Sequence, residues 1–137
     1  MNPPTRVLVA HPERQHSHQL AAGLHAACML AHYYHGAGLT AEVASLLPSS
    51  MRTQVRWFQP MRRLLPFTVP KRHQDHVFLA MLKRFDTFIA RKLEASPCAA
   101  VIAYERSALE TFTAAKRVGA ACILDAASLH HLSLIHI

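Results

Sequence analysis

Two short apolar segments in the last third of the chain, joined by a helix-like segment, constrain the fold most. Residues 99–104 (AAVIAY) and 120–124 (AACIL) are continuous apolar runs of a length typical of strands that are buried on both faces. Between them, Ser107 and Glu110 have the S-x-x-E spacing of a helix-capping box, and Gly119 stands where a helix usually stops. The order strand, helix, strand predicts two parallel strands joined by a crossover helix.

The N-terminal third predicts a second unit of the same kind. Residues 6–10 (RVLVA) have the composition of a short buried strand, and residues 18–34 carry apolar side chains at helical spacing. Gly36 and Gly38 follow in the usual place for a helix stop. Residues 39–44 alternate apolar and polar side chains, which is typical of a strand that is covered on one face.

The middle of the chain separates these two units. Prolines interrupt residues 46–70, and we predict an irregular segment there. From Pro70 onward, residues 77–93 present one apolar stripe at helical spacing, which predicts a long helix. The predicted order is therefore β-α-β-(basic loop)-α-β-α-β. This alternation predicts an α/β fold with a Rossmann-like, doubly wound parallel sheet of four strands, incomplete at the C-terminus.

Charge is unevenly distributed along the chain. The net charge is +7, and no acidic residue lies between Glu42 and Asp75. Basic and aromatic side chains are interleaved in this interval, which suits an anionic membrane surface or single-stranded nucleic acid. A long loop that folds its apolar residues back onto the domain explains the pattern equally well, and we give nucleic acid the least weight. The candidate contacts for a membrane or an anion are Arg52, Arg56, Trp57, Phe58, Arg62 and Arg63.

The composition sets two further bounds. No apolar run reaches the roughly 20 residues that a membrane-spanning helix needs. We expect a cytoplasmic protein, which is peripheral to the inner face of the membrane if the basic segment binds lipid. Cys28, Cys98 and Cys122 lie in apolar surroundings, and we expect them to be buried and reduced.

The sequence lacks the common cofactor motifs. No G-x-G-x-x-G follows the first predicted strand, and no P-loop is present. The chain has 11 histidines, but pairs such as His73 and His76 join no cysteine or acid at a spacing typical of a zinc site. We therefore expect no metal and no cofactor in this chain.

Polar residues follow the predicted strands at the points where each strand ends. They are His11, Ser45, Glu105 with Arg106, and Asp125. Ligands of doubly wound sheets bind beyond the carboxyl ends of the strands. An imidazole and a carboxylate at one such edge bind sugar hydroxyls or transfer a proton. The alternative is that these positions are polar only because strand ends meet solvent.

Two stretches of the chain resemble the N-terminal domain of glycosyltransferases that have the two-domain GT-B fold, close to family 4. The first is RVLVAHP, a polar loop and the helix start QHSHQLA, similar to the H-x-x-x-L-A start of that family. The second and more specific is AYERSALETFTAAKRVGAACILDAASLHH, similar to the family's strand, helix of small residues, K-x-x-G and strand. The chain departs from the family where Pro12-Glu13-Arg14 replaces a Gly-Gly pair, and at Asp125, where many members have histidine.

The resemblance implies that this domain binds the acceptor, which is a sugar or a lipid-linked molecule. A C-terminal domain that this chain lacks would bind the nucleotide-sugar donor and carry an E-x7-E motif, so we expect the chain alone to be inactive. In members with lipid-linked acceptors, a basic and aromatic part of this domain meets the membrane. No catalytic residue is assigned. The residues that the resemblance places in the cleft are His11, His18, Glu105 and Asp125, with His130 behind them.

The last six residues are interpreted separately from the fold. Residues 132–137 read LSLIHI, which matches the translation of a transposase adaptor used in sequencing libraries. We expect the native domain to cover residues 1–131 and to continue into the donor-binding domain. The alternative is a stand-alone flavodoxin-like domain that binds a small anion or a protein partner at the same sheet edge.

Overall fold

Within the described residues, five parallel strands form one sheet in the order β3-β2-β1-β4-β5. The computed structural model describes residues 5–13 and 16–126. The strands are β1 (Val7–His11), β2 (Leu30–His35), β3 (Arg52–Gln54), β4 (Ala100–Tyr104) and β5 (Ala121–Asp125). The helices are α1 (Ser17–Ala26), α2 (Ala41–Leu46), α3 (Phe58–Thr68), α4 (Lys71–Ala95) and α5 (Leu109–Val118), with a 3₁₀ turn η1 at Ser49–Met51.

The strand order confirms the predicted Rossmann-like α/β class. In Rossmann sheets the first strand is central and the order runs 3-2-1-4-5, as it does here. A flavodoxin-like sheet has the order 2-1-3-4-5. The flavodoxin-like topology of the alternative interpretation is therefore wrong, and so is the prediction of four strands.

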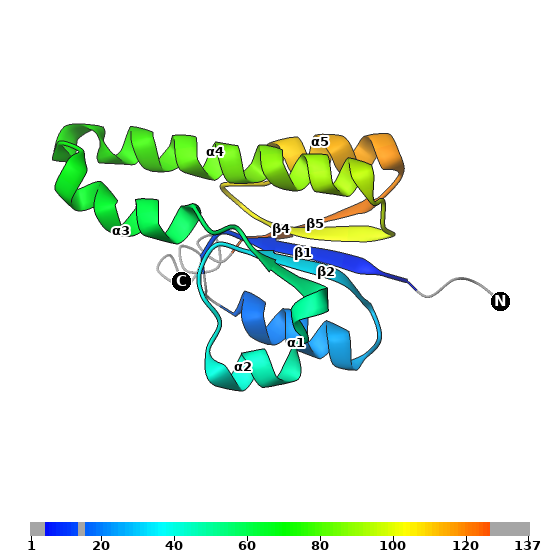
Figure 1. Ribbon diagram of the computed structural model, residues 1–137. Coiled ribbons are helices and arrows are strands. Elements are labelled where there is room, and N and C mark those ends of the chain that lie inside the picture. Colours follow the sequence, from blue (N-terminus) through cyan, green and yellow to red (C-terminus); the bar gives the residue numbers. More distant parts are fainter. Residues whose placement is uncertain (1–4, 14–15, 127–137) are drawn as a thin grey trace, which may run out of the picture.

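Helices cover both faces of the sheet (Figure 1), with α4 and α5 on one face and α1 and α2 on the other. Alternate residues of β1 point to opposite faces. Leu8 belongs to the core under α4 and α5, whereas Val9 belongs to the core under α1 and α2. Phe85, Ile89 and Leu93 of α4 are fully buried in the first of these cores. The central strand is thus covered on both sides, as its continuous apolar run predicts.

The prediction of a helix over residues 18–34 is wrong in its second half. Helix α1 ends at Ala26, and Leu30–His35 form β2, which pairs with β1 on one side and β3 on the other. The turn contains Cys28 in the left-handed region, with a φ of 58°, and the Met29 N–H donates to the Leu24 carbonyl over 2.8 Å. Glycine usually occupies this position of a helix stop. Because cysteine stands there instead, the sequence carries no visible stop signal.

The prediction of a strand over residues 39–44 is also wrong, because this segment contains helix α2. The Thr40 side chain accepts a hydrogen bond from the Val43 N–H over 3.4 Å and so caps the helix. Val43 packs inward with an exposed fraction of 6%. The alternation of apolar and polar residues over only six positions does not distinguish a short amphipathic helix from a strand.

The segment predicted to be irregular contains η1, β3 and α3. The three residues of β3 are polar, and within the described part of the chain they pair only with β2, so they lack the apolar run that marks a central strand. Pro60 is the third residue of α3, where a backbone N–H has no partner inside the helix, so the proline is tolerated. Pro66 lies inside the helix near its C-terminal end.

Helix α5 begins differently from the prediction. Its N-cap position is Ala108, and no side chain of the capping box makes the cap. The carboxylate of Asp86, which comes from α4, accepts the N–H groups of Glu110 and Thr111 over 2.7 and 2.8 Å. The predicted stop at Gly119 is confirmed, because this residue has a φ of 76° in the left-handed region.

The cysteines are free, as predicted, but two of them are not buried. Cys28 and Cys122 are exposed, and Cys98 is half-buried. Cys28 lies in a surface turn and Cys122 in an edge strand, where apolar neighbours in the sequence do not imply burial. Within residues 5–13 and 16–126, no helix is long and apolar enough to cross a bilayer.

Candidate functional site

The carboxyl edge of the sheet brings together polar side chains from several strands. The register pairs His11 at the end of β1 with His35 at the end of β2. It likewise pairs Tyr104 at the end of β4 with Asp125 at the end of β5. Since all strands are parallel, the four residues line one edge, which we call the rim. The structure thus places the predicted candidates His11 and Asp125 at the same rim.

His11 is enclosed and faces Asp125. Its side chain is 1% exposed, its ring centroid lies 4.5 Å from that of Tyr104, and its Nε2 atom lies 3.9 Å from Oδ2 of Asp125. The Nδ1 atom lies 2.9 Å from the carbonyl oxygen of Glu13 and 3.0 Å from its backbone nitrogen, so either tautomer finds a partner there. When the Glu13 N–H donates to Nδ1, the ring proton is on Nε2, the atom that lies 3.9 Å from the Asp125 carboxylate.

Burial determines the charge state of His11. Desolvation lowers the pKa of His11 below its ordinary value of 6.5, and the nearby Asp125 carboxylate only partly opposes this effect. The imidazole is therefore neutral at pH 7, which leaves one ring nitrogen able to accept a hydrogen bond or a proton.

Asp125 lies between two imidazoles. Besides His11, its Oδ2 atom has the Nε2 atom of His16 at 3.4 Å. The side chain of His16 is 61% exposed and that of Asp125 is 12% exposed, so the pair is open to solvent on the His16 side. A hydroxyl-bearing ligand that approaches from this side meets a carboxylate oxygen flanked by two ring nitrogens.

His35 is a rim residue that the sequence interpretation missed. Its Nδ1–H donates to the Ala37 carbonyl over 2.6 Å, and its ring stacks on Tyr33 with the centroids 5.0 Å apart. Burial lowers the pKa of His35, and the positive charge of Arg52 lowers it further. Because the helix predicted over residues 18–34 covers all of β2 except its last residue, the sequence does not predict that this imidazole lies at a strand end.

His18 lies behind the rim rather than at its surface. It is 1% exposed, and its ring contacts those of Tyr33 and His35 edge-on at centroid distances of 5.7 and 5.9 Å. The neighbouring Ser17 Oγ is 2.8 Å from the Tyr33 hydroxyl. The interior next to β2 therefore contains polar and aromatic side chains, and these pack against the rim residue His35.

The other candidates are distributed differently. Glu105 follows β4 and is half-buried, and its backbone N–H donates to the Asp125 carbonyl over 3.1 Å. Ser45, which was expected at a strand end, lies in α2, so it does not belong to the rim. His130 and residues 132–137 lie outside the described residues.

A small pocket adjoins the rim where the loops after β1 and β2 meet α3. Its volume is about 270 Å³, and it is lined by Pro12, Glu13, Ala37, Phe58, Gln59, Arg62 and Arg63. The Arg62 Nε–H donates to the Glu13 carboxylate over 3.1 Å. The two loops are in close contact, because a Cβ atom on Gly36 would stand 2.1 Å from the Pro12 carbonyl oxygen. Arg63 and Gln59 supply further hydrogen-bond donors to this pocket.

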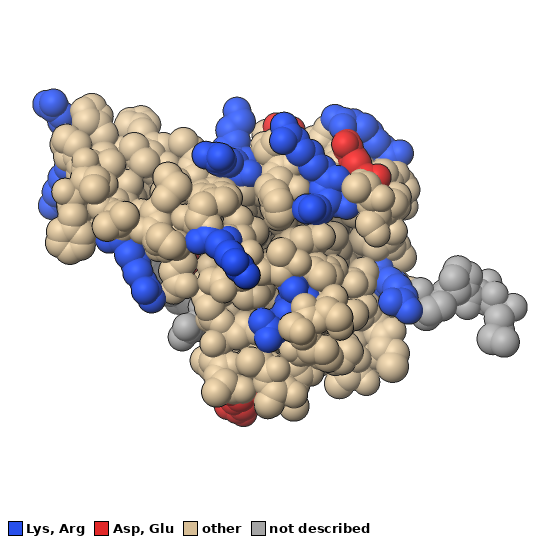
Figure 2. Space-filling view, viewed as in Figure 1, with Lys and Arg blue, Asp and Glu red and all other residues tan. Residues whose placement is uncertain are grey.

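The residues of the predicted basic contact do not act as one surface. Phe58 is 2% exposed and packs in the core, so its assignment as a membrane or anion contact is wrong. Trp57 is half-buried, with the Arg84 guanidinium 5.2 Å from its ring centroid. The Arg52 Nε–H donates to the Leu47 carbonyl, whereas Arg56 and Arg63 are exposed. Figure 2 shows basic side chains scattered over the viewed face, with few acidic ones among them.

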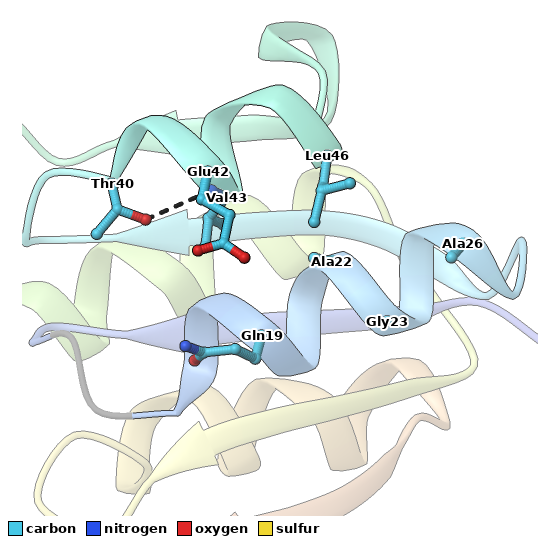
Figure 3. Close-up of a pocket in the computed structure, with 8 residues that line it drawn as sticks. All are labelled: Gln19, Ala22, Gly23, Ala26, Thr40, Glu42, Val43 and Leu46. Carbon is cyan, nitrogen blue, oxygen red and sulfur yellow. Dashed lines mark hydrogen bonds between the residues drawn. The ribbon is translucent and has the colours of Figure 1, made fainter.

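A second groove lies away from the rim, between α1 and α2 (Figure 3). Its volume is about 470 Å³, and Thr40, Glu42 and Gln19 are its polar members. The remaining lining residues are Ala22, Gly23, Ala26, Val43 and Leu46. None of the candidates predicted from the sequence lines it, and it lacks the imidazoles that make the rim chemically capable.

No group of three histidine, cysteine or acidic side chains in the part of the chain that the structure describes is arranged to hold a metal ion. No protein-family model matches the chain, and the comparisons with curated proteins and with solved structures likewise found no match.

Proposed function

We propose that this chain is the acceptor-side, N-terminal part of a GT-B glycosyltransferase that moves a sugar from a nucleotide-sugar donor to an acceptor. The observation that carries the proposal is the meeting of His11, His16 and Asp125 at the carboxyl edge of a Rossmann-like sheet. This edge is where doubly wound folds bind ligands. The resemblance of residues 103–131 to family 4 supports the same assignment.

In the proposed reaction, the bond between the anomeric carbon and the diphosphate breaks, and an acceptor oxygen forms the new bond. The acceptor proton passes to a base or to the departing phosphate. The Asp125 carboxylate accepts a hydrogen bond from the acceptor hydroxyl, and His11 and His16 hold the carboxylate in place. Stabilisation of the departing diphosphate falls to the donor-binding domain, so the chain alone transfers no sugar.

The experiment is to sequence the native gene past the codons for residues 126–131 and to express the complete reading frame. The proposal expects a second Rossmann-like domain with an E-x7-E segment, and transfer from at least one nucleotide sugar to an acceptor. In that enzyme, Asp125→Asn should lower kcat/KM by about 100-fold or more. Glu42→Gln, an exposed change on α2, serves as the matched control and should leave kcat/KM unchanged.

Two outcomes contradict the proposal. If a stop codon follows Ile137, or if the 137-residue chain transfers sugar by itself, the two-domain assignment is wrong. If Asp125→Asn retains full activity in the complete enzyme, the rim is not the acceptor site.

A further inference from the structure

Helix α4 forms most of a hollow that none of the rim residues lines. Its volume is about 630 Å³, which is within the range of ligand-binding pockets. Trp57, in the turn before α3, borders the hollow. The other lining residues lie at helical spacing along one side of α4, and they are Ala80, Lys83, Arg84, Thr87, Phe88 and Arg91.

Positive charge dominates this hollow. Lys83, Arg84 and Arg91 are exposed, and none of them forms an ion pair with an acid among the residues that the structure describes. The helix rises about 12 Å from Lys83 to Arg91, so the cations line the hollow along its length. Figure 2 shows basic side chains along α4 on the viewed face, with few acidic ones beside them.

The acids of α4 do not neutralise these cations. Asp86 is buried and accepts backbone N–H groups of α5. Glu94 pairs with Arg117 of α5, and Asp75 lines a different hollow together with Arg106. The described residues therefore leave the positive charge of the hollow uncompensated, and an anionic ligand would complement it.

Two aromatic rings accompany the cations. Trp57 and Phe88 are half-buried and line the hollow. The Arg84 guanidinium lies 5.2 Å from the Trp57 ring centroid, and the Lys92 ammonium lies 5.4 Å from that of Phe88. Phe88 also contacts Tyr34 of β2 edge-on, at a centroid distance of 5.9 Å, which holds its ring against the sheet. A ligand in this hollow thus meets flat apolar surfaces next to cations.

The polar groups that line the hollow are mainly hydrogen-bond donors. Ammonium, guanidinium and indole groups donate and do not accept. The Thr87 hydroxyl already donates to the Lys83 carbonyl over 3.0 Å. An acidic peptide would bring backbone N–H groups that find few acceptors here. A phosphodiester chain brings charged acceptors, and its bases supply flat rings, so single-stranded nucleic acid complements this lining best.

We propose that the hollow on α4 binds single-stranded nucleic acid, with its three cations contacting phosphates and with bases packing against Trp57 and Phe88. Nucleic acid has the least weight as a ligand of the interval between Glu42 and Asp75, but all the cations of the hollow lie outside that interval. The inference goes beyond the proposed function and does not require it, because this binding is measured without donor or acceptor.

The test measures binding of the complete 137-residue chain to a fluorescein-labelled decamer of thymidylate by fluorescence anisotropy. With three phosphate contacts, the logarithm of the association constant should fall by about 2 for a tenfold rise in salt, because each contact contributes about 0.7. Trp57 is the single tryptophan of the chain. Its fluorescence should therefore decrease when the unlabelled decamer binds and a base packs against the ring.

A decamer of abasic deoxyribose phosphate separates base contacts from charge contacts. It carries the same phosphates, so a site that recognises charge alone would bind the two decamers equally. The proposal expects the abasic decamer to bind at least about 10-fold more weakly and to leave the fluorescence of Trp57 unchanged. Equal affinity for the two decamers contradicts the proposal. So does binding to anionic vesicles or to an acidic peptide by a chain that does not bind the thymidylate decamer.

A pair of variants with the same loss of charge locates the contact. Lys83→Gln/Arg91→Gln should weaken binding at least about 10-fold and make the salt slope smaller by about 1.4. Lys71→Gln/Lys116→Gln removes the same charge outside the hollow and should leave the salt slope unchanged. All four positions are exposed, so both variants should keep the circular dichroism spectrum and Tm of the parent. Equal weakening by the two variants contradicts the proposal, since binding would then follow net charge.

Discussion

At the scale of single residues, the rim depends on imidazoles that are buried in neutral form. His11 and His35 are each 1% exposed, and desolvation lowers the pKa of both. Their Nε2 atoms are buried and have no hydrogen-bond partner among the residues that the structure describes. A buried polar atom without a partner lowers the stability of the fold unless a ligand or water contacts it. Such atoms are common at functional sites.

The first prediction concerns the pH dependence of stability. Because the pKa of His35 is lower in the folded chain than the ordinary 6.5, the unfolded chain binds the proton first as pH falls. The free energy of unfolding should therefore decrease from about pH 6.5 downward and level off below the folded-state pKa. In His35→Asn, whose amide can still donate to the Ala37 carbonyl, this slope should be smaller by up to about 1.4 kcal/mol per pH unit.

Urea denaturation between neutral and acidic pH measures this slope. The groups that surround His35 are His18, Tyr33, His32 and Arg52, and none of them is an acid that would hold the proton. His76→Asn, at an exposed position of α4, is the control for the loss of one imidazole. An unchanged slope in His35→Asn would show that this ring is not a source of acid sensitivity.

The second prediction concerns the turn between α1 and β2. Cys28 adopts a φ of 58°, a conformation that costs a residue with a Cβ atom about 1 kcal/mol and costs glycine nothing. Cys28→Gly should therefore raise the free energy of unfolding by up to about 1 kcal/mol. Cys28→Ala removes the same thiol without relieving the backbone and should not stabilise. Parallel thermal melts in reducing buffer compare the two, and equal Tm values would contradict the explanation.

At the scale of elements, the packing of α5 against α4 depends on one buried carboxylate. Asp86 is 3% exposed and accepts hydrogen bonds from two backbone N–H groups and from the Thr111 hydroxyl. It thereby does for α5 what an N-cap side chain does in most helices. The predicted capping residue Ser107 is buried instead, and its Oγ atom has no hydrogen-bond partner among the described residues.

The third prediction follows from this arrangement. Asp86→Ala should lower the free energy of unfolding by about 3 kcal/mol, because it leaves two N–H groups at the start of α5 without an acceptor. Asp86→Asn keeps one acceptor oxygen, so its free energy of unfolding should lie between those of the parent and of Asp86→Ala. Asp75→Ala, an exposed change on the same helix, should stay within about 0.5 kcal/mol of the parent. Chemical denaturation gives all three values, and a loss at Asp86 no larger than at Asp75 would refute the capping role.

At the scale of the whole molecule, the two edges of the sheet are unequally protected against pairing with another chain. The edge strand β3 is short and polar, which discourages pairing with another chain. The other edge strand, β5, carries Ile123 and Leu124, each 47% exposed. Within the described residues, β5 pairs only with β4. An exposed apolar edge strand is a template for association.

The fourth prediction is that the 137-residue chain self-associates through β5 as its concentration rises. Ile123→Lys should shift the sedimentation coefficient toward that of the monomer, since a charge at this edge opposes pairing. Leu46→Lys, at an equally apolar position on α2, is the control and should leave self-association unchanged. Sedimentation velocity in reducing buffer excludes disulfides of the exposed Cys122. Identical sedimentation profiles for Ile123→Lys and the parent would show that any self-association does not use β5.

The accuracy with which the sequence predicts the structure differs from segment to segment. The strands around Leu8 and Val101 and the long helix around Phe85 follow from their apolar patterns, because buried strands and one-sided helices require those patterns. His11 and Asp125 follow as rim candidates, because they come directly after such strands. The prediction is wrong over much of residues 27–68, because the strands there are polar or aromatic, the helix stop is a cysteine and α3 contains prolines.

The sequence by itself thus determined the α/β class, the parallel arrangement and two of the rim residues. All of these depend on local hydrophobic periodicity, which a single stretch of chain carries. Only the tertiary structure decided that residues 30–35 form a strand between β1 and β3, that His35 joins His11 and that Asp86 caps α5. It also decided that Phe58 is buried while Phe67 is exposed. Each of these facts depends on contacts between residues far apart in the chain, and no local pattern encodes such contacts.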